Sequence, residues 1–357
     1  MVRGGERARP ASATGSARPP GSRGAPRAAR SWPVRLAVVV VLGGLVVLVA
    51  VPGWRSPGYA LHGVAAAPLT TVGGVIAGDP VAPPDSRAHP PALPRLPRGG
   101  VRLFPRFRLV GFSGSPSSPA FGRLGVGDLD QRVSEIERLG RAYAHGHRVM
   151  PVLELIAVIA QRKPGDDGRF RVRVGGDVIQ SYLDAARRHG ALLLLNIQPG
   201  RAHFLDEVKA LAPWLREPDV GLALDPEWAV GPGQVPGRVF GHTTGREIDS
   251  VATFLQGICQ RYRLPDKVLV VHQLAPQVIP DFRGLRPHPG VVVIKSVDGI
   301  GSPAEKTSTW NRLVARLPAV LHPGFKLFFA EDRRSGPLMS PAQVLALHPT
   351  PEYVLYE

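Results

Sequence analysis

The stretch VGLALDPEW, residues 220–228, places five apolar or glycine residues directly before two carboxylates and an indole ring. A continuous apolar run of this kind is typical of a strand buried on both faces of a parallel sheet. Ligands of such sheets bind beyond the carboxyl ends of the strands. Asp225 and Glu227 point to the same side if the chain stays extended, and Pro226 favours an extended residue before it. We therefore expect a buried strand that carries two acids and Trp228 to a binding site.

Apolar runs of the same character recur over residues 101–357. The eight runs span residues 107–112, 149–159, 191–197, 220–224, 267–274, 291–297, 325–329 and 353–356. Amphipathic helical patterns separate most of them, at residues 129–143, 178–189, 204–215, 247–262, 304–317 and 341–347. Between the fifth and sixth runs, two prolines in segment 276–286 allow only a short or irregular helix. Eight strands alternating with helices predict a (β/α)₈ TIM-type barrel, a fold of about 250 residues.

Several helix starts are visible as capping boxes. Thr244, Ser302 and Ser340 each stand three residues before Glu or Gln, and a proline follows the two serines. An open doubly wound sheet is the alternative fold, but it would place a glycine-rich phosphate turn after the first strand, and segment 111–127 contains no G-x-G-x-x-G. No helical pattern follows the eighth run, so we expect the last helix to be either missing or replaced by segment 101–106.

The first hundred residues differ from the rest. Residues 1–34 are mostly Arg, Pro, Ala, Gly and Ser, and we expect them to be disordered. Residues 35–54 contain the apolar run Leu36–Val51, which is flanked by Trp32 and Trp54. This stretch matches the length and interfacial aromatic residues of one transmembrane helix. Residues 55–100 are rich in Pro, Ala and Gly, which is typical of an extended, semi-stiff linker.

The distribution of charge predicts a membrane topology. Residues 1–100 hold 12 Arg, no Lys and 3 acids, so they carry +9 of the formal net charge of +16. Eight Arg and one acid precede Leu36, which places the N-terminus in the cytoplasm and residues 101–357 outside the cytoplasmic membrane as a single-pass protein. The alternative is a signal peptide cleaved near Ala65–Ala67. The folded part contains no basic helix with interleaved aromatic residues, so we expect no nucleic-acid partner.

Polar side chains follow almost every predicted strand at its carboxyl end. In a barrel these ends form one mouth, where barrel enzymes place their active sites. The candidate residues are Glu154, Asn196, Gln198, Asp225, Glu227, Trp228, His272, Gln273, Lys295, Asp298, Glu331 and Asp332. Because Glu154 lies within an apolar run, it is expected to be a buried acid paired with Lys295 or an Arg. No zinc-like ligand spacing occurs, so we predict no catalytic metal. No G-x-S-x-G motif indicates a serine nucleophile, and we predict no cofactor.

Two carboxylates across a barrel mouth are the requirement for glycoside hydrolysis, in which one protonates the leaving oxygen and the other acts as nucleophile or base. We predict Glu227 as the general acid and Glu331 as its partner, with Asp225 as the alternative partner. The other candidates are predicted to bind substrate. Two glutamates after the fourth and seventh strands resemble the large retaining-glycosidase clan of (β/α)₈ barrels, although Pro226 stands where that clan has Asn.

The pattern Gly221-x-x-x-Asp225-x-Glu227 also resembles the fourth-strand signature of chitinase-like barrels. That resemblance implies that Asp225 is a stabilising acid and Glu227 the proton donor. The signature contains four acids, and Val220 and Ala223 replace the first two here.

A wider resemblance covers nearly all of residues 101–357. GLALDPEW, VVHQL, SVDGIGSP, GFKLFFAED and LMSPAQVLAL resemble motifs of a family of uncharacterised exported proteins of high-GC bacteria. The resemblance implies a barrel in an envelope or extracellular setting. We thus expect a membrane-tethered barrel that acts on envelope or extracellular glycan as a glycoside-hydrolase-like enzyme. The alternative is a non-catalytic barrel that binds glycan or other envelope components.

Overall fold

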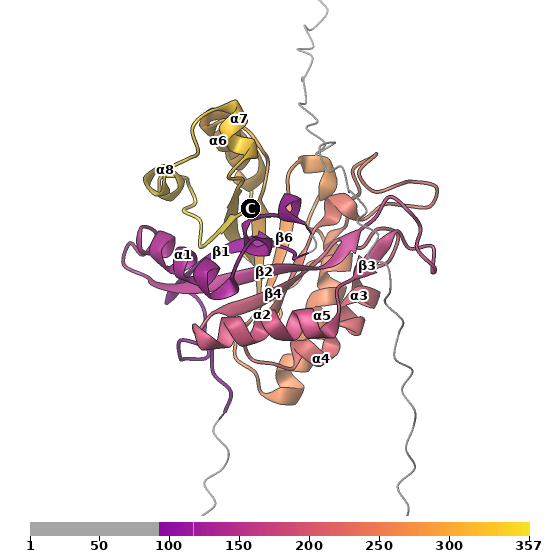
Figure 1. The fold of residues 1–357 in the computed structure, drawn as a ribbon, viewed down its shortest axis with the longest axis horizontal. Coiled ribbons are helices and arrows are strands. Elements are labelled where there is room, and N and C mark those ends of the chain that lie inside the picture. Colours follow the sequence, from indigo (N-terminus) through magenta and orange to yellow (C-terminus); the bar gives the residue numbers. More distant parts are fainter. Residues whose placement is uncertain (1–92, 117) are drawn as a thin grey trace, which may run out of the picture. The chain divides into compact units, whose positions relative to one another are not determined.

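The computed structural model describes residues 93–116 and 118–357, and the predicted cytoplasmic tail, membrane span and most of the linker lie outside these residues (Figure 1). Eight parallel strands form a closed ring, because β1 pairs with both β2 and β9. The strands are β1 (Phe107–Gly114), β2 (Arg148–Ala160), β4 (Leu192–Ile197), β5 (Val220–Leu224), β6 (Lys267–Gln273), β7 (Val291–Val297), β8 (Leu321–Leu327) and β9 (Tyr353–Tyr356). The predicted barrel is confirmed. Within the described ranges, no helix has the length and apolar character of a membrane span.

Helices connect the strands and pack outside the ring (Figure 1). They are α1 (Leu129–Arg141), α2 (Gly176–Arg188), α3 (Phe204–Ala210), α4 (Ala212–Leu215), α5 (Gly245–Tyr262), α6 (Pro303–Val314), α7 (Glu331–Ser335) and α8 (Pro341–Leu345). The helix predicted over 204–215 is divided at Leu211, since Pro213 cannot donate a backbone hydrogen bond. Short 3₁₀ turns complete the connections: η1 (Pro119–Phe121), η2 (Arg123–Gly125), η3 (Pro226–Trp228) and η4 (Pro276–Val278).

Two of the three predicted capping boxes are complete. The Ser302 and Ser340 side chains accept from the backbone three residues on, and the side chains of Glu305 and Gln343 return the contact. At the start of α5, Thr244 accepts from the Glu247 backbone, but the Glu247 carboxylate accepts from the Thr243 hydroxyl instead.

The barrel has two apolar cores, which follow from the alternation of side chains along each strand. Residues such as Leu222 and Leu224 on β5 point outward and pack under the helices. Residues such as Val152 on β2 and Ala223 on β5 point inward and fill the barrel. The one-residue alternation therefore decides which polar residues at the strand ends reach the barrel interior.

The segment before β1 closes the amino-terminal end of the barrel. Leu96 and Leu103 are buried and join the inner core, and the Leu103 backbone donates to Asp266 Oδ2 just before β6. Segment 101–106 thus covers the end of the barrel rather than a gap in the outer layer of helices. The packed part extends back to Leu96, a few residues into the predicted linker.

At the opposite end, β2 continues past its neighbours and pairs with the antiparallel strand β3 (Arg171–Arg173). Arg171 and Arg173 both form ion pairs with Glu207 on α3, which holds the hairpin against the barrel. Neither the hairpin nor its anchor was predicted from the sequence.

Candidate active site

Polar side chains fill the carboxyl-terminal end of the barrel interior. We define the central cluster as the buried residues Glu154 of β2, Asn196 of β4, Asp225 after β5, His272 of β6, Asp298 after β7 and Lys326 of β8. Each belongs to the inward-facing set of its strand, and all except Asp298, which follows Ser296, stand two positions beyond an apolar or glycine residue. Five of the six were predicted from the sequence, and they come from different strands.

Glu154 is the hub of the central cluster. Its Oε1 accepts from Asn196 Nδ2 at 2.9 Å and contacts His272 Nε2 at 3.0 Å, while its Oε2 accepts from the Tyr353 hydroxyl at 2.7 Å. Burial alone would raise the pKa of this carboxyl, but the charge and hydrogen bond of His272, the charge of Lys326 and the Tyr353 hydrogen bond lower it to about 2. The sequence correctly predicted a buried, paired acid, but its partner is His272 rather than Lys295 or an Arg.

His272 lies among three carboxylates. Besides Glu154, its Nε2 is 3.9 Å from Asp225 Oδ1, and its Nδ1 is 3.6 Å from Asp298 Oδ2. Burial acts to lower the pKa of His272, but Glu154 and Asp225 raise it to about 9. The imidazole is therefore a buried cation at neutral pH, and it balances part of the acidic charge.

The ion pair between His272 and Glu154 predicts a pH dependence of the free energy of unfolding. Because the folded pKa of His272 lies above the ordinary value near 6.5, its contribution is complete below that pH and is lost as the pH rises through about 9. Urea unfolding should show a loss on the order of 3 kcal/mol between these pH values. His272→Gln should flatten the profile, while Gln in place of the exposed His203 should not. If the free energy of unfolding changes equally with pH in the wild type and in His272→Gln, His272 is neutral in the folded protein.

Lys326 is a member of the cluster that sequence reasoning missed. Its Nζ forms an ion pair with Glu357 Oε2 at 2.7 Å. Burial would lower the pKa of Lys326, but the charges of Glu357, Asp225, Asp298 and Glu154 raise it well above its ordinary value. Lys326 lies inside the apolar run 325–329, just as Glu154 lies inside the run 149–159. A charged residue within an apolar run indicates a buried, paired charge, and this pattern could have identified Lys326.

The acids after β5 adopt a different geometry from the predicted one. Asp225 has φ −109° and ψ 81°, and residues 226–228 then form η3, so the chain is not extended through Glu227. Pro226 favours an extended residue before itself, but its fixed φ also suits the first position of a helical turn. Asp225 thus stays buried at the end of β5, whereas Glu227 lies within η3 and is partly exposed.

The Glu227 carboxyl group forms no ion pair with the other described residues. Its residue is partly exposed, yet Oε2 is shielded from solvent and has no hydrogen-bond partner among the described residues. Burial of the carboxyl, followed by the charges of Asp225 and Asp298, raises the pKa of Glu227 well above its ordinary range. Burial also raises the pKa of Asp298 to about 6, against the charges of His272 and Lys326. Burial and the neighbouring acids thus favour the protonated form of Glu227.

Gln198 orients the acid near Glu227. Its Nε2 donates to Asp225 Oδ2 at 3.3 Å, and its Oε1 accepts from the Ala160 backbone at 3.2 Å. This predicted substrate-binding residue contacts the central cluster and fixes one face of Asp225.

Three predicted substrate-binding residues do not reach the barrel interior. Lys295 follows inward-facing Ile294, so it points outward and donates to the Leu313 carbonyl of α6 at 2.5 Å. Gln273 follows inward-facing His272, and its amide donates to the carbonyls of Ala275 and Ile279 in the next loop. Neighbours on a strand face opposite sides, so only every second residue near a strand end can reach the barrel interior.

Asp332 is the third of these, and its contacts make it structural. Its Oδ2 is 3.0 Å from Lys306 Nζ, and both side chains are 1% exposed. Its carboxylate also accepts from the backbone N–H groups of Gly301 and Phe328. Asp332 therefore joins α6 and α7 to the barrel.

The remaining predicted residues are Glu331 and Trp228. Glu331 begins α7, is partly exposed and forms no hydrogen bond or ion pair with the central cluster among the described residues. Trp228 ends η3 and is partly buried. No cluster of His, Cys, Asp and Glu with metal-binding geometry occurs in the described ranges.

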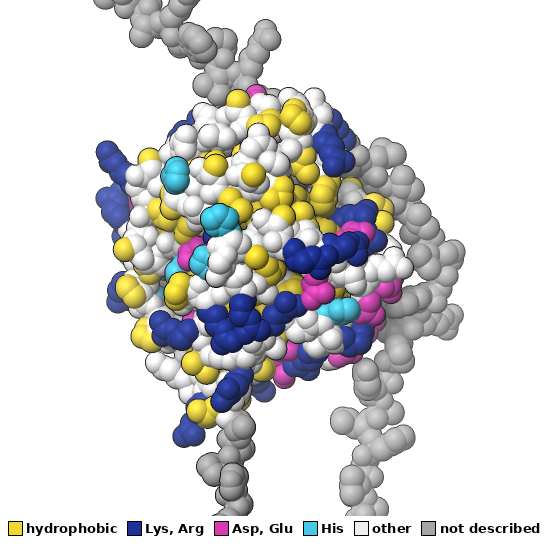
Figure 2. All heavy atoms as spheres, turned by 90° about the vertical axis from the view of Figure 1, so that its left-hand side faces the viewer, with side chains coloured by type: hydrophobic (Ala, Val, Ile, Leu, Met, Phe, Trp, Pro, Cys, Tyr) yellow, Lys and Arg dark blue, Asp and Glu magenta, His cyan; other side chains and the backbone are white. Residues whose placement is uncertain are grey.

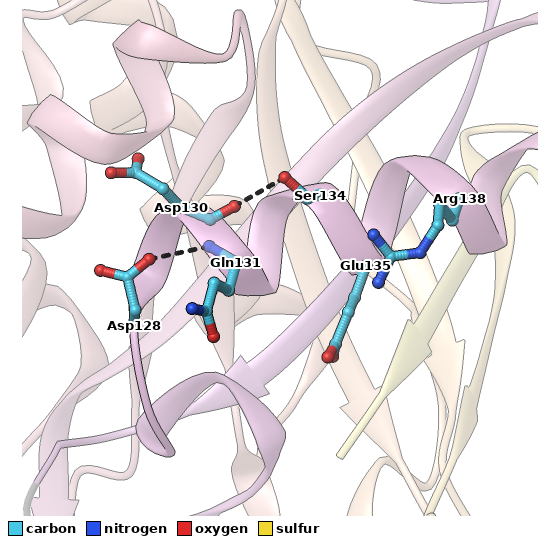
Figure 3. A pocket seen from close by; sticks show the side chains of 6 residues that line it. All are labelled: Asp128, Asp130, Gln131, Ser134, Glu135 and Arg138. Atoms are coloured by element: carbon cyan, nitrogen blue, oxygen red, sulfur yellow. Dashed lines mark hydrogen bonds between the residues drawn. The ribbon is translucent and has the colours of Figure 1, made fainter.

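The outer surface contrasts with this acidic interior. On the face that carries α1, Lys and Arg side chains form a band (Figure 2). A shallow hollow along α1 is lined by Asp128, Asp130, Gln131, Ser134, Glu135 and Arg138 (Figure 3). Asp128 caps α1 through the Gln131 backbone, and Ser134 donates to the Asp130 carbonyl, so local helix contacts explain this hollow. The central cluster is the better candidate for chemistry.

No protein-family model matches the chain, and no curated protein matches it. Its function is therefore inferred from the central cluster and Glu227.

Proposed function

We propose that this protein is a glycoside hydrolase whose general acid is Glu227. The observation that supports this most is a partly exposed glutamate at the mouth of the barrel, with one shielded, unpaired oxygen beside Asp225 and Asp298. Such a carboxyl keeps its proton to a higher pH than an ordinary glutamate, and a proton donor to a glycosidic oxygen needs this property.

Asp225 is the second residue of the proposed mechanism. As Glu227 donates its proton, the bond between the leaving oxygen and the anomeric carbon breaks, and positive charge develops on the sugar ring. Water then forms the new bond to the anomeric carbon, and the proton that the water loses restores Glu227. The Asp225 carboxylate lies near Glu227 and is oriented by Gln198. Its negative charge would stabilise the positive charge of the sugar ring. His272 and Lys326 prevent the buried acids from accumulating excess negative charge. Glu331 is the less favoured partner, because no contact of the described residues joins it to this group.

The test of the activity is a screen of the full-length protein with aryl glycosides and cell-wall polysaccharides. Hydrolysis should fall on the alkaline side as Glu227 loses its proton. Absence of turnover on every substrate, with intact folding by circular dichroism, would refute the proposal.

A non-catalytic glycan-binding barrel is the second candidate, and one observation favours it. Glu154 has three side-chain partners and Lys326 is paired with Glu357, so these two members of the central cluster are satisfied without a substrate. This candidate predicts glycan binding without turnover, and binding that survives Glu227→Gln.

The proposed setting is the outer side of the cytoplasmic membrane, on envelope glycan. The supporting observation is the eight-to-one excess of Arg over acids before Leu36. Alkaline phosphatase fused after Glu357 should be active in bacterial cells, whereas a cytoplasmic fluorescent reporter at the N-terminus should fold. Activity of the fusion only after export is restored by an added signal peptide would contradict this topology. A mature N-terminus near Ala65 would replace the anchor by a cleaved signal.

A further inference from the structure

The connection from η3 to α5, residues 229–244, carries an exposed aromatic side chain at the mouth. We call this segment the rim loop. Phe240 is 38% exposed and the adjacent Val239 is 41% exposed. In the described part of the chain, every other aromatic residue is buried or only partly exposed. Such an exposed ring is available to pack against a ligand that binds at the mouth.

The rim loop is fixed to the backbone of Glu227. The Gly241 N–H donates to the Glu227 carbonyl oxygen at 2.7 Å, and the His242 N–H donates to the Ala229 carbonyl at 3.1 Å. A Cβ at Gly241 would lie 2.2 Å from the Ala229 oxygen, so only glycine permits this approach. Phe240 therefore stands one residue from a direct hydrogen bond to the backbone of the general acid.

Trp228, the aromatic residue predicted to bind sugar, is less available than Phe240. A Cβ added at Gly237 would be 3.5 Å from Trp228 Cζ3, which places the rim loop against this ring. The loop is held there by hydrogen bonds from Val230 N–H to the Gly200 carbonyl and from Arg201 Nε to the Gln234 carbonyl. Trp228 thus supports the loop, and Phe240 presents its ring to solvent.

We infer that Phe240 forms a sugar subsite next to Glu227, stacking on the apolar face of a pyranose ring of the bound glycan; the inference rests on the proposed glycan-directed function. A pyranose presents C–H groups on its faces and hydroxyls around its edge, and a flat aromatic ring complements the former. Arg238 and His242, both exposed, flank Phe240 in sequence and supply hydrogen-bond donors for hydroxyls.

The experiment measures binding separately from turnover. Full-length Glu227→Gln protein, in a detergent without a sugar headgroup, is titrated by calorimetry with oligosaccharides of chitin, cellulose, starch and mannan. Adding Phe240→Ala should weaken binding about tenfold or more, whereas Phe240→Tyr should retain it. Val172→Ala removes a side chain that is 48% exposed on β3, and it serves as the matched control. Thermal melting checks that each variant is folded.

The outcomes separate the subsite from the activity. Equal affinities of the Phe240→Ala and Val172→Ala proteins would overturn the inference even if the wild type hydrolyses glycan. Binding that depends on Phe240 without hydrolysis by the wild type would support the subsite and refute the hydrolase. Failure of every oligosaccharide to bind would overturn the subsite, and the turnover screen would then decide the activity by itself.

Discussion

Glu227→Gln is expected to lower kcat/KM on glycosides by about 10²–10⁴-fold, the usual contribution of a general acid. Glutamine keeps the shape of the side chain but has no proton to donate to the leaving oxygen. Hydrolysis of a dinitrophenyl glycoside should be affected much less, because that leaving group departs without protonation. Steady-state rates on matched nitrophenyl and dinitrophenyl glycosides test this. A uniform loss on both would assign Glu227 to binding or folding instead.

The same variant should be at least as stable as the wild type. The pKa of Glu227 is raised in the fold, so the unfolded chain loses this proton first, and stability falls as the pH rises above about 4.3. Glutamine removes that penalty, and the gain should appear at pH 8 and vanish at pH 4. Leu224→Ala, which empties an outer-core position beside the site, should instead cost about 2–5 kcal/mol. Unfolding of Glu227→Gln at neutral pH would make the residue structural.

The barrel was predictable because its signals are local and repeated. Apolar runs such as 220–224 and serine caps such as Ser302 each specify an element without knowledge of the rest of the chain. Closure of the ring follows from their number and alternation. The β2–β3 hairpin is different, because its anchor is a pairing of Arg171 and Arg173 with distant Glu207. Nothing in the local sequence of residues 161–173 encodes that partner.

The site was only partly predictable for a similar reason. The strand ends identified Glu154, Asp225, His272 and Asp298. The choice between adjacent residues such as His272 and Gln273 depends on which of the two side chains points into the barrel, and this is set by the register of each strand. Lys326 was not predicted, because the sequence alone does not show that Glu357 is its ion-pair partner. The turn at Pro226 also separated two acids that an extended chain would have aligned.

Asp332→Ala is expected to destabilise the protein by about 3–5 kcal/mol, because it leaves the Lys306 ammonium buried without a counter-charge. Burial already lowers the pKa of Lys306, against the charge and hydrogen bond of Asp332. Two backbone donors, at Gly301 and Phe328, lose their acceptor in the same variant. Chemical denaturation at neutral pH measures the loss. Glu331→Ala, at the neighbouring partly exposed position, should change stability by less than about 0.5 kcal/mol.

A double variant distinguishes the ion pair from a role in substrate binding. Lys306→Met together with Asp332→Asn replaces the buried ammonium by an apolar chain of similar length, and the amide oxygen can still accept from one backbone donor. Much of the lost stability should return, since no unpaired charge remains. If Asp332 bound substrate, as the sequence predicted, the double variant would regain stability yet show a raised KM. Recovery of both stability and KM is the expected result, because the Asp332 carboxylate is 1% exposed and its contacts lie between α6, α7 and the barrel.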